Sequence, residues 1–157
     1  VAVDKAGNKN ETTDSIITDT IPPEKPTIEL DDSSDSGIKN DNITNSTLPT
    51  FIGVAEPGST VSIYLGLKHL GEVIVAKDGT WSYTLTTPLK DGEYNITATA
   101  TDIAGHTSAT ANLPFTIDTR ISYFSAEIET TNDSGIVGDN VTNNTRPTFT
   151  GKTEPNA

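Results

Sequence analysis

The chain has 157 residues, of which 22 are acidic and 10 are basic, so its formal charge is −12. This charge excludes proteins that hold a nucleic acid or an anionic membrane through basic surfaces, and the length excludes a large multidomain enzyme. There is no cysteine and no apolar run near the about 18 residues that span a bilayer, so neither disulfide bonds nor membrane insertion is expected.

Internal repeats indicate how the chain is organised. Four motifs recur 98 positions further along: DKAGN at 4–8 as DIAGH at 102–106, DSGI at 35–38 and 133–136, DNITN at 41–45 as DNVTN at 139–143, and PTF at 49–51 and 147–149. A period of this length is the size of an immunoglobulin-like domain rather than of a solenoid unit. We therefore expect the last strand of one repeat in residues 1–19, a complete repeat in 20–118 and the start of another in 119–157. Each terminal piece lacks most of its sheet, so it should be frayed, swapped or completed by other chain.

The complete repeat is predicted to consist of seven short strands. Apolar residues alternate with polar ones in segments bounded by turn residues, at 27–30, 50–55, 60–65, 71–76, 80–86, 92–101 and 107–117. Helical periodicity is absent. The predicted fold class is all-β, with immunoglobulin-like seven-stranded β-sandwich repeats in tandem.

The same alternation predicts which side chains face the core: Ile28, Leu30, Phe51, Val61, Ile63, Leu65, Val73, Val75, Trp81, Tyr83, Leu85, Tyr94, Ile96, Ala98, Ala100, Leu113, Phe115 and Ile117. Trp81 belongs to this set because it begins the alternation with Tyr83 and Leu85 on one face. The alternative is that Trp81 is an exposed platform on which a sugar stacks.

Successive loops of such a sandwich alternate between its two ends. The turn at 102–106 should therefore lie beside the incoming linker, which carries Asp19. The acidic segment 31–45 and the turn that contains Asp91 should lie at the opposite end, beside the outgoing linker with Asp118. Acidic side chains are thus expected to collect at the junctions between repeats.

Several motifs together resemble a known family. They are DTIPP at 19–23, DSGIKNDNITN at 35–45, PTFIGVAEPGS at 49–59, TDIAGH at 101–106 and DTR at 118–120. In order and spacing they resemble the bacterial immunoglobulin-like (BIg) repeats of giant, type-I-secreted, non-fimbrial adhesins of enteric bacteria. The resemblance covers essentially the whole chain, which departs from the family pattern at His106, where Asn is usual, and at Arg120 in the second linker.

This resemblance implies a secreted or cell-surface rod that serves cell adhesion and virulence, with calcium at or near the junctions between repeats. Calcium takes 6–8 oxygen ligands, and carboxylates at the expected junctions can supply them. The candidate ligands are Asp19, Asp35, Asp41, Asp102, Asp118, Asp133 and Asp139. The alternative for segment 31–45 is a solvated, mobile acidic loop, since its spacing is not that of an EF-hand.

The leading hypothesis is a structural and adhesive spacer, a monomeric module whose partners are the neighbouring repeats of the same chain. Host-cell surface glycans would be contacted through other parts of the protein. An enzyme is not expected, because His69 and His106 lack the Ser, Cys or carboxylate arrangement of nucleophilic catalysis. The alternative is a carbohydrate-binding module that uses aromatic residues outside the core, namely Tyr64, Tyr123 and Phe124.

Overall fold

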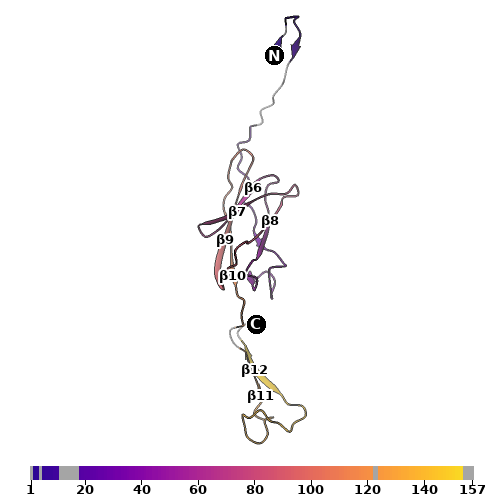
Figure 1. Ribbon diagram of the computed structural model, residues 1–157, viewed down its shortest axis with the longest axis vertical. Helices are drawn as coiled ribbons and strands as arrows, with labels where there is room; N and C mark the ends of the chain where they lie inside the picture. The colour runs from indigo at the N-terminus through magenta and orange to yellow at the C-terminus, as the bar shows by residue number, and fades with distance from the viewer. Residues whose placement is uncertain (1, 4, 11–17, 122–123, 154–157) are drawn as a thin grey trace.

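The computed structural model describes residues 2–3, 5–10, 18–121 and 124–153. Residues 18–121 form a β-sandwich without a helix (Figure 1). One sheet has the strand order β4-β10-β9-β6-β7 and the other has the order β3-β5-β8. The strands are β3 (Glu29–Leu30), β4 (Ile43–Thr44), β5 (Thr50–Val54), β6 (Thr60–Leu65), β7 (Lys68–Ile74), β8 (Thr80–Thr84), β9 (Gly92–Thr101) and β10 (Ala111–Ile117). The predicted all-β, immunoglobulin-like fold class is confirmed.

The fully described segment 18–121 has eight strands, and the prediction of seven was wrong by one. The additional strand, β4, lies inside the acidic segment and pairs in parallel with the end of β10, Ile43 opposite Thr116 and Thr44 opposite Ile117. Two residues are too few to produce a recognisable alternation, so only the pairing with β10 reveals the strand. β4 attaches the acidic segment to the strand that leads directly into the outgoing linker.

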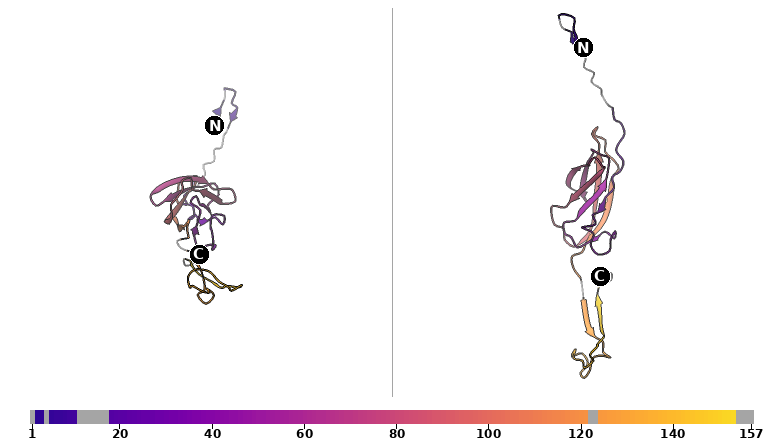
Figure 2. Two further views of the ribbon diagram at one scale, coloured as in Figure 1. Left: turned by 60° about the horizontal axis from the view of Figure 1, so that its bottom comes forward. Right: turned by 90° about the vertical axis from the view of Figure 1, so that its right-hand side faces the viewer.

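The chain enters the sandwich at one end and leaves it at the opposite end (Figure 2). We call these ends the incoming pole and the outgoing pole. The antiparallel pairing of β5 with β8 and of β6 with β9 makes successive connections alternate between the poles. The turn at 102–106 therefore lies at the incoming pole, and the acidic segment lies at the outgoing pole.

Every residue predicted to face the core is buried in it or packed against it. Phe51 is fully buried, with its ring edge-on to Phe115 at a centroid distance of 5.0 Å, and Phe115 also stacks on Tyr94 at 5.6 Å. Ala111 belongs to the core as well and was not predicted. Trp81 is 4% exposed, so its assignment to the core is confirmed and the exposed sugar platform was wrong.

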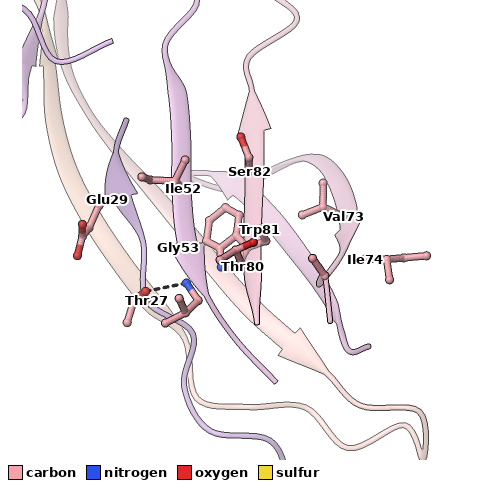
Figure 3. Close-up of a pocket in the computed structure, with 11 residues that line it drawn as sticks. Thr27, Glu29, Ile52, Gly53, Val73, Ile74, Thr80, Trp81 and Ser82 are labelled. Atoms are coloured by element: carbon pink, nitrogen blue, oxygen red, sulfur yellow. Dashed lines mark hydrogen bonds between the residues drawn. The ribbon is translucent and has the colours of Figure 1, made fainter. Parts of the chain in front are cut away.

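Gly53 on β5 leaves the space that the Trp81 ring occupies. A Cβ at this position would lie 2.1 Å from the carbonyl oxygen of Thr27 and 2.8 Å from Cε2 of Trp81. Figure 3 shows the indole beside Gly53, at a groove of about 750 Å³ that Val73 and Ile74 of β7 also line. Glycine is thus required here by close packing of the backbone rather than by a turn.

Two short antiparallel pairs lie outside the sandwich (Figure 1): β1 (Ala2–Val3) with β2 (Lys9–Asn10), and β11 (Phe124–Ile128) with β12 (Phe149–Thr153). In the second pair Ile128 lies opposite Phe149, as Leu30 lies opposite Phe51 in the complete repeat. Phe149 is nevertheless 64% exposed, because no further strand covers this pair within the described residues. The described part of the chain contains no helix that could span a membrane.

Candidate metal centre

The turn at 102–106 connects β9 to β10 and holds an acid and an imidazole side by side. The backbone N–H of Gly105 donates to the carbonyl of Asp102 at 3.2 Å, and Gly105 has φ +93°, a conformation that favours glycine. The backbone N–H of His106 donates to Oδ1 of Asp102 at 2.9 Å. Oδ2 of Asp102 then lies 3.1 Å from Nδ1 of His106. The turn therefore holds the side chains of Asp102 and His106 together at the incoming pole.

Asp102 is nearly enclosed, with only 2% of its side chain exposed. Burial opposes ionisation, but the hydrogen bonds from the backbone and ring of His106 outweigh it and hold the pKa of Asp102 below its ordinary value. The imidazole is more open, at 35% exposure. The pair thus joins a buried carboxylate to a partly exposed imidazole.

Asp19 in the incoming linker brings a second carboxylate to this pair. One ligand atom from each of Asp19, Asp102 and His106 lies within 4.8 Å of the other two. Oδ1 of Asp19 accepts the backbone N–H of Ile21 at 3.1 Å, which turns the linker at this point. The structure brings together Asp19 and Asp102, as the alternation of loops predicts. His106 was missed, although its four-residue separation from Asp102 in a tight turn was a usable signal.

The acidic segment at the outgoing pole is folded around Asp35. This side chain is 3% exposed, and its Oδ2 accepts the backbone N–H of Asn40 at 2.5 Å. Its Oδ1 is buried and has no hydrogen-bond partner. Asn40 and Asn42 adopt positive φ values of 66° and 61°, which asparagine tolerates better than most residues. Asp35 is therefore not a solvated side chain.

The copy of this segment 98 residues later has the same internal hydrogen bonds. Oδ2 of Asp133 accepts the backbone N–H of Gly138 at 2.6 Å, and Oδ1 of Asp133 is again buried without a partner. Asp139 accepts the N–H of Val141 at 2.9 Å, just as Asp41 accepts that of Ile43 at 2.9 Å. The two copies thus present the same unpartnered carboxylate oxygen.

The two copies differ at Lys39, and sequence reasoning missed this difference. Its ammonium donates to the carbonyl of Asp32 at 2.8 Å and to the carbonyl of Asp35. The corresponding residue of the next copy is Val137. The complete repeat therefore carries a cation of its own beside Asp35.

Asp118 lies beside the acidic segment, where it lines a cavity of about 380 Å³ together with Ser36, Asp41 and Asn45. Asp118 is exposed, and its Oδ1 accepts the backbone N–H of Arg120 at 3.2 Å. Within the described residues, three ligand atoms come within 4.8 Å of one another only at the Asp19, Asp102 and His106 group. At the outgoing pole, Asp35, Asp41 and Asp118 share a region but are not drawn together to that extent.

Asp91 holds the outgoing linker, a role that sequence reasoning missed. Its Oδ1 accepts a hydrogen bond from the hydroxyl of Thr119 at 2.7 Å, and its Oδ2 accepts one from Nε of Arg120 at 2.8 Å. Nη2 of Arg120 forms an ion pair with the same oxygen at 2.8 Å. The hydrogen bond from Thr119, followed by the one from Arg120, lowers the pKa of Asp91 below its ordinary value against the opposing effect of burial. The sequence signal for this contact was the position of Arg120 in the linker, at the pole where Asp91 was predicted to lie.

Asp91→Ala is expected to loosen residues 119–120 without unfolding the sandwich. Exposed ion pairs contribute little to stability, so the melting temperature should change little while the linker loses its tether. The heteronuclear NOE of the Thr119 amide should fall. Asp78→Ala, which removes an acid at the incoming pole, serves as the control and should leave this NOE unchanged. A Thr119 amide as ordered in Asp91→Ala as in the wild type would contradict the tether.

A family model described as a bacterial Ig-like domain matches residues 20–119. The chain belongs to this family. The chain is similar to Bacillopeptidase F of Bacillus subtilis (strain 168), with 41% identity over 75 residues, which cover 48% of the chain and 5% of that protein. Among solved structures, the PKD domain of an M14-like peptidase from Thermoplasmatales archaeon SCGC AB-540-F20 is similar with a TM-score of 0.40 and 21% identity, covering 62% of the chain and 96% of that domain.

The buried carboxylates of the acidic segment and of its copy fit a hard cation. Calcium prefers carboxylate and carbonyl oxygens, and the buried oxygens of Asp35 and Asp133 lack any hydrogen-bond partner. A buried carboxylate oxygen without a partner is costly unless a cation or donor satisfies it. The residues present are thus compatible with calcium at the acidic segment.

Proposed function

We propose that this bacterial Ig-like domain is a structural spacer of a secreted or cell-surface protein, with calcium stiffening the junctions between neighbouring repeats. The observation that carries the proposal is the position of Asp19, a linker residue whose carboxylate lies with Asp102 and His106 of the folded domain. A cation shared by linker and domain would neutralise their mutual repulsion and remove bending freedom. The full protein that contains this domain is proposed to be a giant, type-I-secreted adhesin, because the motifs of the chain resemble those of the repeats in such adhesins.

The calcium ligands proposed at the incoming junction are Asp19 and Asp102. Those proposed at the outgoing junction are Asp35, Asp41 and Asp118, with Asp133 and Asp139 as their counterparts in the following repeat. Extracellular calcium-binding modules have affinities of about 10⁻⁴–10⁻³ M. The junctions would therefore be loose at cytosolic calcium levels during type I secretion and stiff outside the cell.

The proposed role is accessory rather than catalytic, which is typical of Ig-like domains. The similarity to Bacillopeptidase F covers 5% of that protein, so it supports a module of a larger surface protein and not peptidase activity in this chain. The neighbouring repeats are the proposed partners, and contact with host glycans is assigned to other parts of the protein.

No observation on the described residues favours the alternative of a carbohydrate-binding module. Trp81 is buried, and the ring of Tyr64 lies against His69 at a centroid distance of 4.9 Å. Phe124 is exposed, but its counterpart in the complete repeat is the fully buried Pro26. Tyr123 lies outside the described residues.

Calcium is expected to raise the melting temperature of the chain more than magnesium does. An ion that binds only the folded state stabilises it by about 2.7 kcal/mol at a hundredfold excess over its Kd. Magnesium requires near-octahedral geometry and dehydrates reluctantly, so its effect should be smaller. Calorimetric melts at matched ionic strength measure the difference, and the amide NOEs of Thr20 and Thr119 report whether the linkers stiffen.

The double variant Asp35→Asn, Asp41→Asn should lose most of the calcium-induced shift. Glu29→Gln, combined with Glu72→Gln, removes the same number of charges from exposed strand positions and should retain the shift. Equal shifts with calcium, magnesium and sodium would reduce the effect to charge screening and overturn the calcium proposal. Unchanged linker NOEs in saturating calcium would overturn the stiffening of the junctions.

A further inference from the structure

The group at the incoming pole differs from an all-oxygen calcium site because one of its three ligand atoms is a nitrogen. Asp19 and Asp102 supply carboxylates, and His106 supplies an imidazole, with one ligand atom of each within 4.8 Å of the others. Two carboxylates balance the charge of a dication, and imidazole is a neutral ligand that zinc, copper and nickel accept readily. The donor set is thus that of a borderline transition metal.

We propose that Asp19, Asp102 and His106 form a site for a transition-metal dication of the zinc class, which binds there more tightly than calcium. The inference rests on the proposed function, since it concerns the ion at the same incoming junction. It departs from that function at the incoming junction, where His106 joins Asp19 and Asp102 as a ligand and the ion is of the zinc class instead of calcium. The outgoing junction keeps its proposed calcium ligands.

The number of available ligands favours zinc over calcium at this position. Calcium needs 6–8 oxygens, and Oδ1 of Asp102 is already engaged by the backbone N–H of His106. Zinc needs four ligands and commonly takes three from the protein and one from water. The three side chains and one water would supply the four ligands of zinc, whereas calcium would need at least two further oxygens.

The spacing of the donor atoms also fits a small ion. Two ligands that bind zinc at about 2.0–2.2 Å with a tetrahedral angle are about 3.4 Å apart. Oδ2 of Asp102 and Nδ1 of His106 are 3.1 Å apart, so a shift of a few tenths of an ångström suffices. Without an ion, Nδ1 is hydrogen-bonded to Oδ2 of Asp102. A bound ion would replace the proton on Nδ1, and the neutral imidazole would then carry its proton on Nε2.

The chain contains an internal comparison for the role of His106. Residues 4–8 carry the same sequence motif but end in Asn8, whose side chain is an amide instead of an imidazole. Amide oxygens are ligands of hard cations such as calcium. One residue in this turn would therefore select the class of ion at each junction, and His106→Asn converts this junction to the type of its neighbour.

The test is isothermal titration of the full chain at neutral pH with zinc chloride alone and with calcium chloride alone. The wild type is compared with His106→Asn, with His106→Gln and with His69→Asn, which removes the other imidazole. Loss of a direct ligand should weaken zinc binding by more than the about 10–100-fold effect of losing an outer-shell partner. His69→Asn should retain wild-type affinity, and calcium binding should not weaken in His106→Asn.

An independent readout is the ¹⁵N resonance of the His106 ring. Coordination through Nδ1 should shift that nitrogen on addition of zinc and leave the ring of His69 unaffected. Zinc affinity unchanged in both His106 variants, or a wild type that prefers calcium at this site, would overturn the inference.

The two proposals fail in different experiments. Zinc binding that depends on His106 but leaves the Thr20 amide as mobile as before would support the site and contradict junction stiffening. Calcium-dependent stiffening with zinc binding indifferent to His106 would support the proposed function and overturn the zinc site.

Discussion

Phe51→Ala is expected to lower the free energy of unfolding of the complete repeat by about 3–5 kcal/mol. Phe51 is fully buried on the central strand of the three-stranded sheet and packs edge-on against Phe115 of the opposite sheet. Its truncation removes the principal aromatic contact between the two layers and leaves a cavity. Denaturant unfolding followed by the fluorescence of Trp81, the single tryptophan of the chain, measures the loss.

The chain provides a matched control for this substitution. Phe149 occupies the same position 98 residues later and is 64% exposed. Phe149→Ala should therefore change the unfolding free energy of the complete repeat by no more than about 0.5 kcal/mol. Equal effects of the two substitutions would mean that β11 and β12 belong to the same cooperative unit as the sandwich.

Gly53→Ala is expected to destabilise the repeat by about 1–3 kcal/mol, as overpacking of a well-packed core does. The added Cβ would meet the backbone carbonyl of Thr27 at 2.1 Å, and no rotamer change can relieve a contact with backbone. Residue 27 is also held to β5, because its N–H donates to the carbonyl of Val54 at 2.9 Å. The clash should displace the strand start at 27–30 and the ring of Trp81 together.

Val54→Ala is the control for Gly53→Ala. Val54 is the next residue on β5, its side chain is 50% exposed, and its truncation should cost less than about 1 kcal/mol. Chemical denaturation of both variants, with the near-ultraviolet circular dichroism of Trp81, distinguishes local strain from general loss of packing. A Gly53→Ala variant as stable as the wild type would show that the backbone at Thr27 yields at no cost.

The core could be predicted from the sequence because strand periodicity needs only local information. Alternate residues of a strand face opposite sides of the sheet, so apolar residues such as Val61 and Ile63 identify their own face. The turn at 102–106 is equally local, since Asp102, Gly105 and His106 are bound to one another within five residues. β4 was missed for the opposite reason, because its two residues become a strand only through pairing with β10.

Strand alternation predicts that Asp102 lies beside Asp19, but the individual contacts that each acid makes could not be derived from spacing. The acids at 35 and 102 look alike in sequence, yet Asp35 is enclosed by its own loop while Asp102 shares a cluster with Asp19, 83 positions away. Asp91 holds Thr119 and Arg120 because the end of β10 returns beside the start of β9 in antiparallel register. Repeat spacing and strand alternation thus specify the fold and the pole at which each acid lies. The tertiary structure decides which partners each acid contacts. The reason is that hydrogen bonds and shared ion sites of carboxylates depend on distances of a few ångströms, which are set by how the strands pair and how the linkers lie against them.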